Sequence, residues 1–176
     1  MSFGSQLFLD AARCSAWANQ SLLESCSVLS NEELDRDLRI SHLNIIGTLS
    51  HIYHGERVWL DCLVTTPDSG HWRLPVGPDA NLSLDRLRRD WPDIWDGFSR
   101  WLEHKSDAAL ENELLLHLPG AVQARFPRWK VLRHVLHHST LHRGQVIGMI
   151  RILGHQPPAV SPMDYYLSNP KATPPR

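Results

Sequence analysis

The residues best suited to chemistry lie in the stretch His134–Leu153, HVLHHSTLHRGQVIGMIRIL. Read as a helix, it places His134, His138 and His142 one above another on one side, because residues four apart share a helix face. At about 100° per residue, His138 and His142 point within roughly 60° of the apolar side chains of the same helix. Those apolar side chains are Val131, Val135, Met149 and Leu153.

Imidazoles inside an apolar stripe need a hydrogen-bond partner or a metal ion. Burying an unsatisfied polar group costs on the order of 1–3 kcal/mol. Histidines at i and i+4 can bind one ion, as they do in the HExxH helix of zinc proteases. Here the segment is HSTLH and lacks the glutamate, which excludes the protease mechanism. The stripe predicts a metal site, with core histidines satisfied by hydrogen bonds as the alternative.

A third ligand must come from another helix, and His51 is the best candidate. A helix is expected from Ser41, a plausible N-cap, to Val64. His51 lies in the middle of its apolar face, and Gly55 is one turn further on. A glycine there costs about 1 kcal/mol relative to alanine, so it leaves room either for a metal or ligand or for close helix contact. The other members of that face are Thr48, Ile52, Val58, Trp59 and Cys62.

The remaining polar candidates are less well placed. His134 could be a partner of a ligand or could line the pocket, whereas His137 and His54 are rotated away from the two apolar stripes. Gln145, one turn beyond His142, could orient a ligand histidine or a bound water. Arg143 is expected in a salt bridge or an interface.

Four long helices are expected along the chain. They are bounded approximately by Ser5–Val28, Ser41–Val64, Ser83 to beyond Leu102, and Pro127–Gly154. In the third, the core stripe contains Trp91, Trp95 and Phe98, and Pro92 predicts a kink or a split. Residues 65–81 are rich in Pro, Gly and Asp and predict a long surface loop. Residues 111–128 predict a small hairpin, and 163–167 a short helix in the tail. We expect one domain over 1–176.

Composition describes an ordinary globular protein and excludes several classes of function. The 176 residues are 42% hydrophobic and 21% charged, with a net charge of −1, so no basic surface for nucleic acid is indicated. Cys14, Cys26 and Cys62 match no zinc or redox spacing, and the start of the chain lacks the pattern of a signal peptide. With no apolar run long enough to span a membrane, these features predict a cytoplasmic protein.

Several segments together resemble the DinB/YfiT-like superfamily of metal-dependent enzymes. They cover nearly the whole chain, and the HxxxHRGQ element with a histidine on an upstream helix is fairly specific. The segments are Trp17–Asn19, Thr48–Leu60 (TLSHIYHGERVWL), His134–Val146 (HVLHHSTLHRGQV), Ile152–Pro158 and Asp164–Tyr166.

The resemblance implies an all-α four-helix bundle, often a homodimer, that holds a divalent metal. Carried over position by position, its ligands are His51, His138 and His142, the three histidines already selected by their spacing. Characterised members of the superfamily include thiol-dependent S-transferases and a mycothiol-dependent isomerase. Such enzymes would use the metal to lower the pKa of a low-molecular-weight thiol cofactor.

Three hypotheses of function follow. The first is an enzyme that uses Zn²⁺ or Ni²⁺ to transfer a small thiol to a small electrophilic molecule. The second is metal-dependent hydrolysis, for which a general base is hard to find: Glu56 is rotated about 140° from His51 and Asp164 lies in the tail. The third is a non-catalytic metal-binding stress-response protein that works through its dimer surface.

Overall fold

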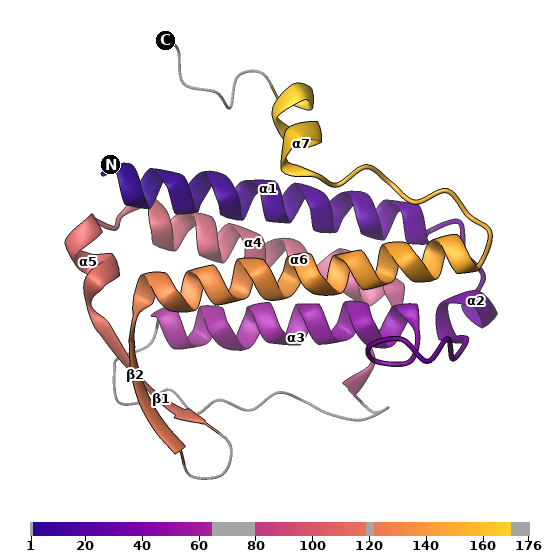
Figure 1. Ribbon diagram of the computed structural model, residues 1–176, viewed down its shortest axis with the longest axis horizontal. Coiled ribbons are helices and arrows are strands. Elements are labelled where there is room, and N and C mark those ends of the chain that lie inside the picture. The colour runs from indigo at the N-terminus through magenta and orange to yellow at the C-terminus, as the bar shows by residue number, and fades with distance from the viewer. Residues whose placement is uncertain (1, 65–79, 119–121, 170–176) are drawn as a thin grey trace.

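Four long helices pack side by side in the computed structural model, which describes residues 2–64, 80–118 and 122–169 (Figure 1). They are α1 (Phe3–Cys26), α3 (Ile45–Val64), α4 (Leu84–Glu103) and α6 (Arg128–Ile152). Helices α1 and α3 each contact both α4 and α6, so the four form a ring around one core. Helices α1 and α6 run in one direction and α3 and α4 in the other. The predicted all-α four-helix bundle is confirmed.

Short elements connect and flank the bundle. They are α2 (Asn31–Asp35), α5 (Asp107–Glu111), β1 (Glu113–Leu118), β2 (Val122–Pro127) and α7 (Pro162–Ser168). Strands β1 and β2 pair antiparallel with Leu114 opposite Phe126, which confirms the predicted hairpin before the last long helix. Helix α7 confirms the short helix expected in the tail. The long loop predicted after α3 falls mainly on residues 65–79, outside the described residues.

The core is built from apolar stripes at helical spacing. On α4, Leu87, Trp91 and Leu102 are fully buried, as their spacing of four and eleven residues predicts. Helix α4 runs through Pro92 without the predicted split, although proline cannot donate a hydrogen bond to the carbonyl four residues earlier. Within the described ranges, the helices are too short or too polar for any of them to cross a membrane.

Helix α3 begins at Ile45, later than the expected start at Ser41. The N-cap is Asn44, whose side-chain oxygen accepts a hydrogen bond from the Gly47 N–H at 2.7 Å. Before it, Arg39, Ser41 and Leu43 have φ of 56°, 52° and 71°, a left-handed conformation that is uncommon without glycine. The alternating conformation turns the chain on itself, and the N–H of Leu38 donates to the carbonyl of Leu43 at 2.8 Å. Residues 36–44 are called the α2–α3 loop below.

Helix α6 follows Pro127 and ends as its sequence predicts. Gly154 has φ of +87°, and the N–H of His155 donates back to the carbonyl of Ile150 at 3.1 Å. This is the usual glycine-terminated end of a helix. The helix therefore spans the histidine stretch without interruption, so His134, His138 and His142 lie on successive turns of one face.

Candidate metal centre

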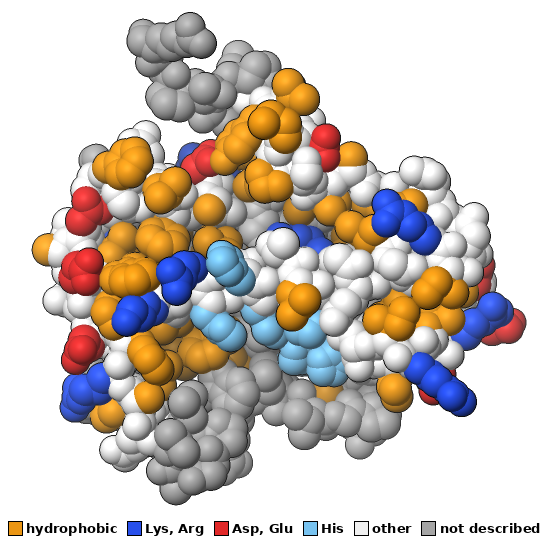
Figure 2. All heavy atoms as spheres, in the orientation of Figure 1, with side chains coloured by type: hydrophobic (Ala, Val, Ile, Leu, Met, Phe, Trp, Pro, Cys, Tyr) orange, Lys and Arg blue, Asp and Glu red, His pale blue; other side chains and the backbone are white. Residues whose placement is uncertain are grey.

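The interface between α3 and α6 brings the three predicted ligands together. The Nε2 atoms of His51 on α3 and His138 on α6 are 2.9 Å apart. The ring of His142 lies one turn along α6, with its centroid 4.6 Å from that of His51 and 4.5 Å from that of His138. Figure 2 shows that histidine side chains gather on one face of the molecule, over α6 and α3.

Gly55 gives the ring of His138 its place. A Cβ at Gly55 would lie 3.2 Å from Cε1 of His138, closer than ordinary van der Waals contact. Gly55 stands one turn after His51 on the same face of α3, so the missing side chain leaves space beside His51. Of the two reasons considered for this glycine, the structure supports close helix contact, because the imidazole of His138 on α6 packs directly against Gly55 on α3.

Gln145 orients His142 from the next turn of α6. Its amide oxygen is 2.6 Å from Nδ1 of His142. An amide oxygen only accepts, so Nδ1 carries the proton and Nε2 keeps its lone pair for a ligand or donor. The hydroxyl of Ser41, in the α2–α3 loop, is 3.1 Å from the same Nδ1. The contact between Gln145 and His142 matches the role suggested for Gln145 from the sequence.

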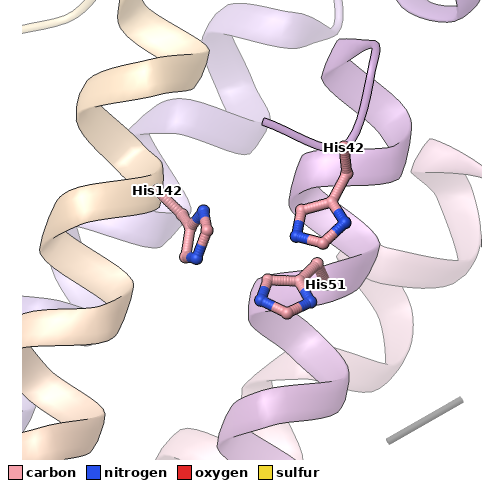
Figure 3. A group of neighbouring side chains, drawn as sticks. All are labelled: His42, His51 and His142. Atoms are coloured by element: carbon pink, nitrogen blue, oxygen red, sulfur yellow. The ribbon is translucent and has the colours of Figure 1, made fainter. Parts of the chain in front are cut away.

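His42 belongs to the same cluster and was missed by the reasoning from sequence. Its ring stacks on that of His51, with centroids 3.8 Å apart and an angle of 24° between the planes. Ring nitrogens of His42, His51 and His142 all lie within 4.8 Å of one another, and Figure 3 shows the three rings facing a common space. His138 is not in this group of mutually close nitrogens, but its Nε2 contacts that of His51, and the four residues are called here the four-histidine cluster.

The reason it was missed is geometric. On a continuous helix, residues 42 and 51 would point about 180° apart, because nine residues make two and a half turns. The helix begins only at Ile45, however, and the left-handed residues of the α2–α3 loop place His42 back over the N-terminal part of α3. No spacing rule signals such an arrangement.

The cluster is held in its neutral form. Burial, with smaller contributions from the neighbouring imidazoles, lowers the pKa of His51 to about 3 and that of His138 to about 4. Burial also lowers the pKa of His42, and it lowers that of His142 against the opposing hydrogen bond to Gln145. At neutral pH these rings carry lone pairs and no charge, which is the form that binds metal.

The other histidines near the site have separate contacts. His134 is exposed, with its ring 5.7 Å from that of His138 and edge-on to Trp59 at 5.1 Å. His54 is turned away from the cluster, and its Nε2 lies 2.8 Å from the carbonyl oxygen of Ala80. His137 is exposed on α6, as its rotation from the stripe predicts.

A buried carboxylate lies behind the cluster but is fully occupied. The side chain of Glu56, on α3, is 4% exposed and accepts four hydrogen bonds from three other helices. The donors are Ser139 at 2.7 Å, Asn19 at 3.0 Å, Trp91 at 2.6 Å and Trp95 at 3.2 Å. With its oxygens occupied in this way, Glu56 is poorly suited to act as a general base.

Arg143 extends this buried network and is not a surface residue. It donates to the hydroxyl of Ser15 at 2.8 Å and to the side-chain oxygen of Asn19 at 2.9 Å. Burial lowers its pKa, and the nearby charge of Glu56 opposes that shift. The expected salt bridge or interface is therefore replaced by hydrogen bonds inside the bundle.

The hollow beside this network is too small for a substrate. It lies between α1, α4 and α6, and none of the four histidines lines it. The space that the centre of a water molecule can reach is about 20 Å³, enough for about one water. Access to the four-histidine cluster therefore does not run through this hollow.

A four-helix bundle with histidines clustered between its second and fourth long helices defines a class of protein that can be compared with known families. The sequence profile of the DinB family matches residues 5–176, and the chain belongs to this family. Protein DinB of Bacillus subtilis (strain 168) is 24% identical over 156 residues, which cover 86% of this chain and 87% of that protein.

Proposed function

We propose that His51, His138 and His142 bind one divalent metal ion and that the protein is a metal-dependent enzyme which transfers a small thiol to an electrophilic molecule. The observation that carries the proposal is the convergence of these imidazoles from two helices. Nitrogen ligands lie about 2.0–2.1 Å from zinc, so two of them at a tetrahedral angle on one ion are separated by roughly 3.3–3.4 Å. The Nε2 atoms of His51 and His138, which share a hydrogen bond at 2.9 Å in the metal-free chain, lie within about 0.5 Å of this separation.

The donor set also suits the proposed ion. Neutral imidazoles bind Zn²⁺ and Ni²⁺ well, and three protein ligands leave positions for a reactant. When bound, such an ion lowers the pKa of a thiol so that the thiolate is available at neutral pH. The chain supplies the neutral rings, and Gln145 fixes the tautomer of His142. The four hydrogen bonds to Glu56 leave it poorly placed to assist an attacking water as a base, which favours a thiol as the nucleophile.

The proposed reaction needs no redox partner. The thiol loses its proton to solvent, and its sulfur forms a bond to an electrophilic carbon of the substrate. The leaving group departs with the electron pair of its bond to that carbon. We also propose that the protein is a homodimer of single-domain chains in a reducing cytosol. The three cysteines support that compartment, since all are buried and free.

Metal analysis of protein purified without a histidine tag tests the centre. We expect about one divalent ion per chain, lost in His138→Ala and kept in His137→Ala, the matched control on the next residue. An ion content that is the same in both variants would place the metal elsewhere. Absence of metal from purified and reconstituted protein would exclude the enzyme proposal.

A thermal-shift screen then tests the reaction class with glutathione, bacillithiol and mycothiol. We expect at least one thiol to raise the melting temperature of the metal-loaded protein and to leave the metal-free protein unchanged. Indifference of the loaded protein to all three would contradict thiol transfer and favour hydrolysis or a non-catalytic role.

A further inference from the structure

We propose that His42 is a fourth ligand of this centre, supplied by the α2–α3 loop, and that an incoming thiol displaces it. The inference rests on the proposed metal site and concerns what occupies the position left open by the three helical histidines. Four imidazoles complete the tetrahedral set that closes a zinc site, whereas three leave it open.

The first argument is reach. One ring nitrogen of His42 lies within 4.8 Å of one nitrogen each of His51 and His142, so a shift of at most about 1.5 Å brings it to the separation of two ligands on one ion. The ring is already parallel to that of His51 at a centroid distance of 3.8 Å. Figure 3 shows His42 above His51, with His142 across the space that the three rings share.

The second argument is the conformation that holds His42 there. Ser41 and Leu43, on either side of it, both have positive φ, and Arg39 makes a third such residue in five. Side chains other than glycine rarely adopt this conformation, and where they do the surroundings must hold it. The hydroxyl of Ser41 contacts His142, and the N–H of Asn44 donates to the carbonyl of His42. The loop is thus tied to His142 on the Ser41 side of His42 and to itself on the Asn44 side.

The third argument separates His42 from the other three by its exposure and its place outside the helices. His51, His138 and His142 are fixed on long helices and are partly buried, whereas His42 is exposed and lies outside any helix. A ligand on a loop can leave without disturbing the bundle. When a thiol binds, its sulfur takes the place of one imidazole nitrogen, the thiol proton passes to solvent, and His42 remains neutral beside the site.

Cobalt substitution gives a test that does not depend on activity. Co²⁺ is added to the full chain, and the variants His42→Cys and His137→Cys are compared. A sulfur bound to Co²⁺ adds a charge-transfer absorption in the near ultraviolet. We expect this band in His42→Cys and not in His137→Cys, whose position is equally exposed but outside the cluster. A structural role for His42 would give no band in either variant.

Loss of the ring is tested with His42→Ala. We expect the affinity of this variant for Co²⁺, measured by competition with a chelator, to be at least roughly tenfold lower than that of the parent. Loss of a residue that only hydrogen-bonds to a metal ligand already lowers affinity by about this factor. The melting temperature of the metal-free variant should stay close to that of the parent, since the residue is exposed. Unchanged metal retention together with no band in His42→Cys would overturn the inference.

Displacement is tested with 2-mercaptoethanol as the probe thiol. We expect it to add the sulfur band to the Co²⁺ protein at lower concentration in His42→Ala than in the parent, because no imidazole competes for the position. Equal concentrations would show that His42 does not occupy the place of the thiol. If His51→Ala retained Co²⁺ or the parent bound none, the proposed metal site itself would fail, an outcome distinct from the others.

Discussion

The proposed binding of a metal depends on the positions of single imidazole rings, and Gly55 is the residue that tests it most directly. The His138 ring occupies the space of the missing side chain, with Cε1 3.2 Å from the position of a Cβ. Alanine favours a helix by about 1 kcal/mol over glycine, so Gly55→Ala should stabilise α3. The same methyl group should push the His138 ring out of its place.

We therefore expect Gly55→Ala to bind metal on the order of tenfold more weakly without loss of stability in the metal-free protein. Competition with a chelator measures the first quantity, and urea unfolding the second. Gly148→Ala in α6 is the matched control, because a Cβ there meets nothing within 4 Å. It should gain about 1 kcal/mol and keep its affinity for metal. Equal affinity in the two variants would contradict the role given to Gly55.

At the scale of elements, the start of α3 decides both helix stability and the position of His42. Asn44 accepts from the Gly47 N–H at 2.7 Å and donates to the carbonyl of Asp35 at 3.2 Å, which ties the end of α2 to the start of α3. Asn44→Ala should lower the free energy of unfolding by about 0.5–2 kcal/mol, the usual cost of losing an N-cap. Urea unfolding measures it, and Asn44→Asp, which keeps the cap, should lose less.

A second contact at this scale makes stability depend on pH. Glu33 of α2 lies 2.8 Å from His155, just after α6, and hydrogen bonds from His155 and from Ser30 lower its pKa to about 2. A carboxyl group whose pKa is depressed on folding stabilises the protein above its unfolded value of 4.5. That contribution is lost as the pH falls from 4.5 towards 2.

We expect the stability of Glu33→Gln to fall less steeply with acid over this range than that of the parent protein, as measured by urea unfolding at successive pH values. Because the side chain is at the surface, solvent screening keeps the difference small. Glu24→Gln, at an exposed position on α1, serves as the control. A steeper loss in Glu33→Gln would reverse the sign assigned to the contact.

These elements also show how far the sequence predicts the structure. The spacing of apolar residues and the capping residues locate the four helices. Ser83 caps the start of α4 and Gly154 ends α6, and both depend only on neighbouring residues. The pairing of His51 with His138 follows from apolar stripes that must face each other. His42 does not follow, since three left-handed residues without glycine are favoured only by tertiary contacts. The hydrogen-bond network of Glu56 does not follow either, because its partners come from helices distant in sequence.

At the scale of the whole molecule, the Glu56 network joins all four long helices. Glu56 belongs to α3, and its donors come from α1, α4 and α6. Ser139, one of these donors, follows His138 directly. Because each donor is itself buried or partly buried, the carboxylate fixes the distance between α3 and α6 on which the histidine pair depends.

Removal of this carboxylate should therefore destabilise the whole bundle. In Glu56→Ala, two indole N–H groups, an amide and a hydroxyl lose their acceptor. The buried guanidinium of Arg143 also loses a nearby negative charge that favours its charged form. Each buried donor left without its acceptor costs about 1–3 kcal/mol, so we expect a loss of several kcal/mol in the free energy of unfolding. Urea unfolding followed by tryptophan fluorescence measures it and also reports the surroundings of Trp91 and Trp95.

Glu103→Ala is the matched control, because Glu103 pairs with Arg13 at 3.0 Å on the surface. An exposed pair contributes about 0–1 kcal/mol, so this variant should unfold nearly as the parent does. Partial recovery is expected in Glu56→Gln, whose amide oxygen still accepts from some of the four donors. Losses of similar size in Glu56→Ala and Glu103→Ala would mean that the network does not set the spacing of the helices, and the histidine pair would then need another support.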